Sequence, residues 1–249
     1  MPDHVRIAAA GDVHCEPRHR EDALRAFKGL AGSADLLLLA GDLTTHGEPE
    51  QAEVLAEACA PLEIPVVAVL GNHDWHCPRV EDILPIWRAA GITVLERDHT
   101  VVEVGGVDVG IAGTKGFVGG FPGSRLPDFG EPSLRGVYAE AGEEVEALDR
   151  GLRAIAHCPV RVALLHYAPT SETLVGEPEP IWAFLGTDRL APPIAEHEPD
   201  LVLHGHAHHG TFEGRIGTVP VYNVSVPVMR QDFWVFELSG VEHATTPIH

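Results

Sequence analysis

The sequence predicts an α/β fold with a β-rich centre, and two observations support this. Short apolar runs alternate with stretches of helical spacing over the first 90 residues. After residue 92 the period changes: three β-rich runs follow one another, and Gly105-Gly106 between two of them is a hairpin signal. Strands recur from residue 5 to residue 238 without a linker-like interval, so we expect residues 1–249 to form one domain.

The first part of the chain is predicted to form two successive strand–helix–strand units. Continuous apolar runs, typical of strands buried on both faces of a parallel sheet, occupy residues 5–10, 36–40 and 66–70. Helical spacing that starts with acidic residues predicts a helix over 21–30, and a proline before an alanine-rich body predicts another over 49–62. Such units imply parallel strands with right-handed crossovers.

The later elements mix helices with short strands. A third helix is expected over residues 82–90, where Gly91 ends it, and a long one over 137–156. The β-rich runs are expected to be antiparallel strands that extend the first sheet or open a second one: residues 93–95, 100–104 and 107–112. Further strands are expected at 160–165 and 201–203. Short strands at 211–212, 218–224 and 233–238 would close a second sheet, and the tail after Gly240 should be frayed.

A long loop is predicted over residues 113–132, which contain six glycines, three prolines and three phenylalanines. Loops of this length in compact domains are usually functional or disordered. One interpretation is a lid on the substrate side, with Phe117, Phe121 and Phe129 free to stack or pack. The other is a structural loop with a small apolar anchor. A second, proline-containing loop is expected over 167–182.

Polar side chains that can bind metals follow five of the predicted strands. The blocks are Gly11-Asp12-Val13-His14, Gly41-Asp42, Gly71-Asn72-His73-Asp74, His166 and His204-Gly205-His206-Ala207-His208. Open α/β sheets place their sites at the carboxyl ends of the strands. Residues two apart in an extended segment point to the same side, so Asp12 with His14, and His206 with His208, can each aim two ligands at one point.

These blocks supply more ligands than one metal needs. The candidates are Asp12, His14, Asp42, Asn72, His166, His206 and His208. A tetrahedral zinc takes only four ligands. The surplus predicts two divalent metals that share a bridging carboxylate, about 3.5–4 Å apart, as in two-metal phosphoester hydrolases. Mixed His, Asp and Asn ligation suits Mn, Fe, Zn, Co or Ni, among which we place manganese and iron first.

The order of the five blocks over residues 12–208 resembles the calcineurin-like metallophosphoesterase family. The resemblance implies two β-sheets packed face to face with flanking helices, a four-layer α/β/β/α sandwich. It also implies that Asp42 bridges the two metals. Asp12, His14 and His208 would hold the first metal, and Asn72, His166 and His206 the second. His73 resembles the family's catalytic histidine, and Asp74 would orient it.

The resemblance implies a phosphoesterase in which a metal-bridging hydroxide attacks phosphorus while His73 assists the leaving group. The phosphoprotein-phosphatase branch has Gly-Asp-x-x-Asp-Arg-Gly in its second block and Glu at the end of its third. This chain has neither, since Leu43 follows Asp42 and the third block ends in Asp74. Both departures argue against a protein serine/threonine phosphatase. The pattern more closely resembles the branch that cleaves phosphodiesters, including cyclic nucleotides, so we expect small phosphodiesters as substrates. A phosphomonoesterase acting on small metabolites is the alternative. A non-catalytic metal-binding scaffold is a second class, although scaffolds usually lose a ligand or the catalytic histidine.

The resemblance implies a small-molecule phosphoester as the partner, and composition argues against nucleic acid. The net charge of −20, with Lys28 and Lys115 as the only lysines, argues against binding to a nucleic-acid backbone. No apolar run approaches the length of a membrane span and no Cys-x-x-Cys pair occurs, so we expect a cytoplasmic protein without a membrane partner. Oligomeric state stays open. Cys15 and Cys77 adjoin the blocks as soft ligands or redox switches, or, as we favour, as small packing residues. His46, His76, His204 and His209 flank the blocks and could contact substrate or support a ligand.

Overall fold

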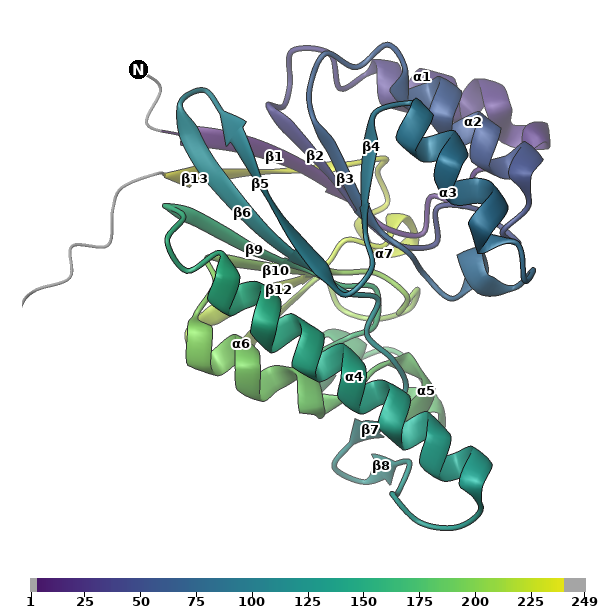
Figure 1. Ribbon diagram of the computed structural model, residues 1–249, viewed down its shortest axis with the longest axis vertical. Helices are drawn as coiled ribbons and strands as arrows, with labels where there is room; N and C mark the ends of the chain where they lie inside the picture. The colour runs from purple at the N-terminus through teal and green to yellow at the C-terminus, as the bar shows by residue number, and fades with distance from the viewer. Residues whose placement is uncertain (1–3, 240–249) are drawn as a thin grey trace, which may run out of the picture.

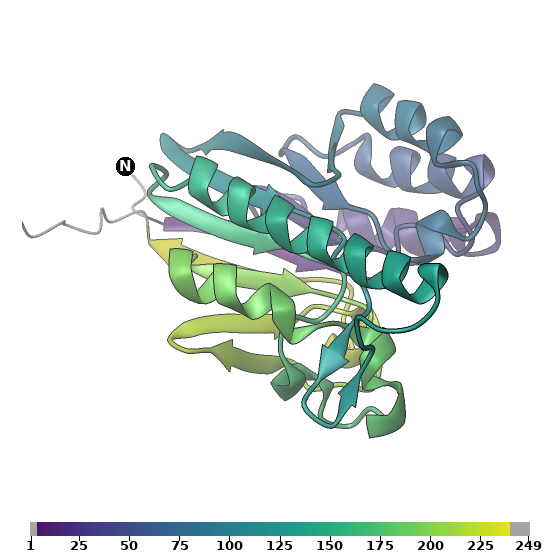
Figure 2. The same cartoon turned by 60° about the horizontal axis from the view of Figure 1, so that its bottom comes forward.

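Two large β-sheets packed face to face form the centre of the computed structural model, which describes residues 4–239 (Figure 1). The first sheet has the strand order β13-β1-β2-β3-β4 and the second the order β11-β12-β10-β9-β6-β5. Helices α1, α2 and α3 cover the outer face of the first sheet, while α4 and α6 cover that of the second (Figures 1 and 2). The four-layer arrangement implied by the resemblance is therefore confirmed.

The first sheet is built from parallel strands joined by helical crossovers. Its parallel strands are β1 (His4–Ala10), β2 (Leu36–Ala40), β3 (Val66–Val69) and β4 (Ile92–Leu95). The crossover helices are α1 (Arg20–Lys28), α2 (Pro49–Cys59) and α3 (Val80–Ala89). Alternate side chains face opposite cores: Leu37 and Leu39 pack under the helices, while Leu36 and Leu38 pack between the sheets. This double burial explains the continuous apolar runs of the sequence.

The second sheet combines four parallel strands with one antiparallel strand at each edge. Its members are β5 (Asp98–Val104), β6 (Val107–Gly113), β9 (Val160–Leu164), β10 (Leu201–His204), β12 (Val219–Asn223) and β11 (Glu213–Ile216). β5 and β6 pair antiparallel, as Gly105-Gly106 predicted, and β11 pairs antiparallel with β12. Helices α4 (Pro132–Ala154) and α6 (Ala191–His197) close the outer core, and Figure 2 shows the long teal α4 across that face.

Three predictions about strands are wrong. β4 lies parallel to β3, because α3 provides a crossover that returns the chain in the same direction. β13 (Trp234–Ser239) pairs antiparallel with β1 in the first sheet and does not close the second. This pairing covers the edge of β1 and places Phe236 in the core between the sheets. Residues 211–212 precede β11 and lie outside it. The prediction for the tail after Gly240 falls outside the described residues.

The long loop after β6 contains a small hairpin, formed by β7 (Gly120–Phe121) and β8 (Ser124–Arg125). Phe121 is buried with its ring centroid 6.5 Å from that of Trp182, whereas Phe129 is 77% exposed. Part of the loop is therefore an apolar anchor. The remaining short helices are η1 (Pro17–His19), η2 (His73–Trp75), η3 (Ser171–Leu174), η4 (Glu179–Ile181), α5 (Trp182–Leu185), η5 (Asp188–Leu190) and α7 (Val226–Met229).

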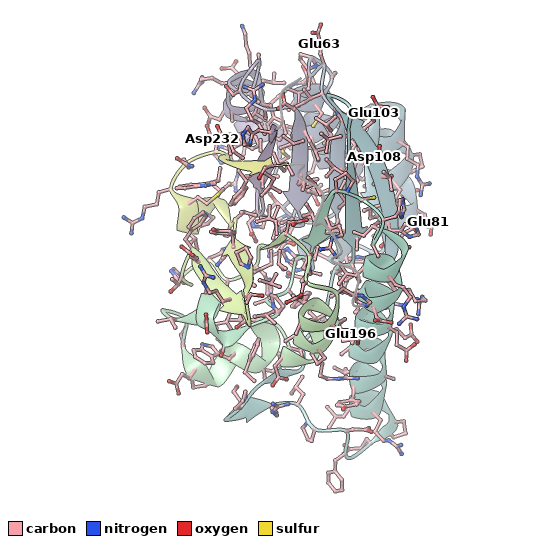
Figure 3. The ribbon with its side chains drawn as sticks, turned by 90° about the vertical axis from the view of Figure 1, so that its left-hand side faces the viewer. Glu63, Glu81, Glu103, Asp108, Glu196 and Asp232 are labelled. Atoms are coloured by element: carbon pink, nitrogen blue, oxygen red, sulfur yellow. The ribbon has the colours of Figure 1, made fainter. Side chains whose placement is uncertain are left out.

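Exposed acidic residues occur on helices, strands and loops. Figure 3 labels six of them: Glu63, Glu81, Glu103, Asp108, Glu196 and Asp232. Only two of these are cross-strand partners, Glu103 on β5 and Asp108 on β6. Over residues 4–239, no helix is both long enough and apolar enough to span a membrane.

Candidate metal centre

The structure brings the predicted ligands together at the carboxyl ends of β1, β2, β3, β9 and β10. Two groups of ligand atoms form there, each with its atoms within 4.8 Å of one another. The first group contains Asp12, His14, Asp42 and His208, and the second contains Asp42, His166 and His206. The Oδ1 atom of Asn72 joins the second group at 2.9 Å from His166 Nε2. Asp42 thus belongs to both groups, as a bridging ligand would.

The backbone is strained where it delivers these side chains. Asp12, His14, Asp42 and His206 have φ angles of 59°, 42°, 50° and 71°, in the left-handed region that side chains other than glycine rarely adopt. They are four of the seven non-glycine residues with positive φ in the described part of the chain. Such strain costs about 1–3 kcal/mol at each residue and persists at functional sites, where the surrounding structure enforces it.

Two glycines allow the ligand loops to approach one another closely. Gly41 has a φ of +80°, and a Cβ atom placed there would lie 2.5 Å from Nδ1 of His166. A Cβ atom on Gly71 would lie 2.0 Å from Oδ1 of Asp42. Glycine is therefore required at both strand ends for His166 and Asp42 to occupy their positions.

His166 presents an unprotonated nitrogen to other acceptors. Its Nδ1–H donates to the Ala40 carbonyl over 2.8 Å, and burial lowers its pKa well below the usual value, so the ring is neutral. Nε2 is then an acceptor, and it faces Asn72 Oδ1 at 2.9 Å and Asp42 Oδ1 at 3.3 Å. Three acceptor atoms therefore converge, Nε2 of His166 and the Oδ1 atoms of Asn72 and Asp42, and together they could bind a cation.

The two histidines of the last block, His206 and His208, are oriented by different partners. Nε2 of His206 donates to the Phe184 carbonyl over 3.1 Å, which leaves Nδ1 for the site, while its backbone N–H donates to Asp12 Oδ2 over 2.9 Å. Nε2 of His208 lies 2.8 Å from Asp12 Oδ1. The ring of Tyr167 lies 4.4 Å from that of His206 and forms one wall beside it.

The electrostatics of the pocket also fit divalent cations. Asp12, Asp42 and Asp74 are all buried. Burial, reinforced by the charges of Asp12 and Asp74, raises the pKa of Asp42 to about 9. Burial acts in the same direction on Asp12, but the His208 hydrogen bond and nearby imidazoles outweigh it and lower that pKa. Nδ1 of His14 is buried without a hydrogen-bond partner among the described residues. Buried carboxylates of like charge need positive compensation, which Asp, Asn and His ligands would hold in place.

The raised pKa of Asp42 predicts how the metal-free protein responds to pH. At pH 7 the folded state keeps this proton, whereas an unfolded Asp, with a pKa near ~3.9, has lost it. The raised pKa contributes its whole stabilisation of the folded state at pH values below the pKa of the unfolded Asp. This stabilisation is lost as the pH rises towards about 9, the pKa of the folded state. We expect the free energy of unfolding in EDTA to fall by about 1 kcal/mol between pH 7 and pH 8. Urea titrations of wild type and Asp42→Asn measure this, and equal slopes in the two proteins would contradict it.

His73 lies beside the two groups, and its orienting partner differs from the predicted one. Its Nδ1 lies 2.8 Å from the Thr45 carbonyl, and its Nε2 lies 3.9 Å from Asp42 Oδ2. The Asp74 carboxylate instead accepts the backbone N–H groups of Leu43, Thr44 and Gly71 and the Thr44 hydroxyl. Asp74 therefore ties the loop after β2 to the loop after β3. The expectation that Asp74 orients His73 is corrected, because the Thr45 carbonyl is the hydrogen-bond partner of His73 Nδ1 and the Asp74 oxygens accept from other residues.

The flanking residues divide into packing and site neighbours. His204 is fully buried and lies 2.8 Å from both the Thr173 hydroxyl and the Gly205 carbonyl, so it is a core histidine. The His76 ring lies 4.2 Å from the His73 ring. His46 contacts Gln51, and the His209 backbone N–H donates to Glu177. Cys15 is buried, and burial raises its pKa to about 12, as expected for a packing residue, while Cys77 is half-buried.

A cavity of about 500 Å³ opens beside the second group of ligands. Its lining includes Leu70, Asn72, Trp75, Leu95, Glu96, Arg97, Lys115, Phe117, Glu140, Glu144 and Tyr167. These residues come from the ends of β3, β4, β6 and β9 and from α4. Sequence reasoning singled out Phe117 and the loop that carries it. It did not predict that α4 and Tyr167 line the cavity. For Tyr167, the only signal in the sequence was its position directly after His166.

A two-sheet α/β sandwich with Asp, Asn and His gathered at five strand ends defines a metal-dependent phosphoesterase. The chain belongs to the calcineurin-like phosphoesterase family, whose sequence pattern it matches over residues 5–210. No curated protein sequence matches it significantly.

Solved structures share this fold at low sequence identity. Phosphopantetheinyl hydrolase (PptH) from Mycobacterium tuberculosis has a TM-score of 0.68 and 16% identity, covering 95% of this chain and 97% of its own. GAP50, the anchor in the inner membrane complex of Plasmodium, has a TM-score of 0.57 and 13% identity, covering 90% and 72%. A putative 5′-nucleotidase from Staphylococcus aureus, in complex with alpha-ketoglutarate, has a TM-score of 0.55 and 15% identity, covering 99% and 56%. At these identities the likeness establishes the fold alone.

Proposed function

We propose that this protein is a dinuclear-metal phosphodiesterase that hydrolyses small phosphodiesters. The observation that carries the proposal is the cavity of about 500 Å³ beside the second group of candidate ligands. A monoester needs room for one organic group, whereas a diester needs room for two. Small-molecule sites typically have about 300–1,000 Å³, so this cavity can hold a second ester group.

The candidate ligands supply the chemistry of phosphoester hydrolysis. Divalent cations bound by the two groups would lower the pKa of water and neutralise phosphoryl oxygens, and we place manganese and iron first. Asp42 would bridge them because its carboxylate belongs to both groups. His166 Nδ1 donates to the Ala40 carbonyl and His206 Nε2 donates to the Phe184 carbonyl, which fixes the ring nitrogen of each histidine that faces the site.

His73 is the residue we assign to the leaving group. The Thr45 carbonyl accepts from Nδ1, which turns Nε2 towards the site beside Asp42. When the ring is protonated, Nε2–H can donate to the departing oxygen, which would otherwise leave as an alkoxide. His73 is half-buried, and the His14 and His76 rings lie 4.6 and 4.2 Å away, so its orientation is restricted. Asp74 would act by holding the two ligand loops together.

The surface charge supports a small substrate. Nucleic-acid binding depends on clustered Lys and Arg, and this chain has 17 such residues against 37 acidic ones. We therefore propose a small-molecule phosphodiester as the partner. The names of the fold neighbours suggest phosphopantetheinyl and nucleotide esters for a first substrate panel.

Matched chromogenic esters test the proposal. Manganese-loaded protein is given ethyl 4-nitrophenyl phosphate and 4-nitrophenyl phosphate, which release the same leaving group. We expect kcat/KM for the diester to exceed that for the monoester by at least about tenfold, the ratio that 1.4 kcal/mol of preferential binding gives. Preference for the monoester would support a phosphomonoesterase instead. No turnover of either ester by metal-loaded protein would support a non-catalytic scaffold.

A further inference from the structure

Lys115 places a positive charge in the wall of the cavity beside the candidate metal centre. It lies two residues after the end of β6, and its backbone carbonyl accepts the N–H groups of His166 and Tyr167, which fixes its backbone beside the site. It is one of two lysines in the chain, and the other, Lys28, is exposed on α1. The position of Lys115 is therefore set by the same strand ends that gather the candidate ligands.

The ammonium of Lys115 lacks a fixed anionic partner. Nζ donates to the Gly116 carbonyl over 3.2 Å and lies 4.3 Å from the centre of the Phe117 ring and 5.3 Å from that of Tyr167. No carboxylate of residues 4–239 comes within ion-pair distance of it. An ammonium has three donors, so at least one is available to a molecule in the cavity. Nearby carboxylates act on this half-buried charge only through space, so a bound acceptor would use a donor that the protein leaves available.

Three acidic residues of the same cavity, Glu96, Glu140 and Glu144, act on Lys115 through space without an ion pair to it. Arg97 forms ion pairs with Glu140, Glu143 and Glu144 of α4. Glu144 also accepts the Gly116 N–H over 3.0 Å and the Thr114 hydroxyl. This cluster ties α4 to the loop around Lys115 and more than offsets the charge of Arg97. Among the described residues, Lys115 is then the cation of the cavity lining that has no direct carboxylate partner.

We propose that the cavity binds the second ester arm of the substrate and that Lys115 donates to an oxygen acceptor on that arm. Trp75, Phe117 and Tyr167 would pack against its flat or apolar part. The substrate class is a small phosphodiester whose arm combines a flat surface with a carbonyl or anionic oxygen, as a nucleoside does. This inference rests on the proposed phosphodiesterase function.

Kinetics with three diesters that share 4-nitrophenolate as leaving group test the role of Lys115. We expect Lys115→Met to lower kcat/KM for thymidine 5′-(4-nitrophenyl phosphate) by about 10–100-fold, as for loss of a charge-assisted hydrogen bond. Ethyl 4-nitrophenyl phosphate, whose arm has no acceptor, should change less than about threefold. The cationic 4-nitrophenyl phosphorylcholine should be a poor substrate that improves in Lys115→Met. Lys28→Met should match wild type on all three. An equal loss on the thymidine and ethyl esters would place Lys115 at the phosphate and overturn the proposal.

Amine labelling of the wild-type protein gives a readout that does not depend on turnover. Limited acetylation followed by mass spectrometry reports Lys115 and Lys28 separately. We expect thymidine 5′-monophosphate to protect Lys115 and leave Lys28 unprotected, whereas ethyl phosphate should protect neither. Absence of protection at Lys115 would overturn the proposal even if diesters are turned over. If thymidine 5′-monophosphate protected Lys115 but no diester were turned over, the proposed function would be refuted, whereas the proposed binding site for the arm would be supported.

Discussion

Replacing Asp42 with Asn is expected to lower kcat/KM for a diester by about three orders of magnitude. Asp42 is the carboxylate that both groups of candidate ligands share, and its atoms lie within 4.8 Å of the other ligand atoms in each. Metal-ion catalysis contributes several kcal/mol, and each 1.36 kcal/mol is tenfold in rate, so loss of about 4 kcal/mol corresponds to this factor. The amide keeps the shape of the side chain but removes the negative charge. Steady-state kinetics measure the loss of activity, and metal analysis by mass spectrometry measures the accompanying loss of bound metal.

Asp35→Asn is the matched control for this change. Asp35 is a half-buried Asp whose Oδ1 lies 2.7 Å from Arg6 Nη2, far along the sheet from the candidate metal centre. It should retain wild-type kinetics and metal content. If Asp42→Asn kept both metals and full turnover, Asp42 would not be the bridging ligand.

His73→Gln is expected to slow hydrolysis by an amount that depends on the leaving group. For an alkyl diester, whose alkoxide needs a proton to depart, we expect a loss of about 10²–10⁴-fold. For a 4-nitrophenyl ester, whose leaving group departs as a stable anion, the loss should be far smaller. The ratio of the two kcat values in one variant isolates proton donation from general damage to the site.

His157→Gln controls for removing an imidazole, because His157 is exposed in the loop before β9, at the opposite end of that strand from His166. It should leave both substrates unaffected. An equal loss on the two esters in His73→Gln would show that His73 binds or positions the substrate and does not protonate the leaving group.

The sequence predicts the site well where strands and ligands coincide. Each block directly follows an apolar strand, and parallel strands end at one edge, so Asp12, Asp42 and Asn72 meet once the first sheet forms. His166 follows a strand of the second sheet and joins them because the two sheets pack face to face. The continuous burial of strands such as β2 made those strands easy to recognise. That these residues bind metals, and that residues 1–249 form one domain, stay predictions.

Other features depend on contacts that no local pattern reveals. β13 joins β1 across more than two hundred residues of sequence. It does so because β1 would otherwise leave an open sheet edge and because Phe236 packs in the core between the sheets. The partner of His73 is the backbone carbonyl of Thr45, and every residue carries such a carbonyl. Asp74 follows His73 in sequence, yet its carboxylate accepts hydrogen bonds from the backbone N–H and the hydroxyl of Thr44. The cavity likewise exists only because α4 packs against the loop that carries Lys115.

Anomalous diffraction from crystals grown with manganese tests the central claim most directly. The account predicts two manganese peaks about 3.5–4 Å apart, with Asp42 between them. The Asp12, His14 and His208 side chains should surround one peak, and Asn72, His166 and His206 the other. A single peak, or two peaks that do not share Asp42, would contradict the dinuclear centre on which the proposed function rests.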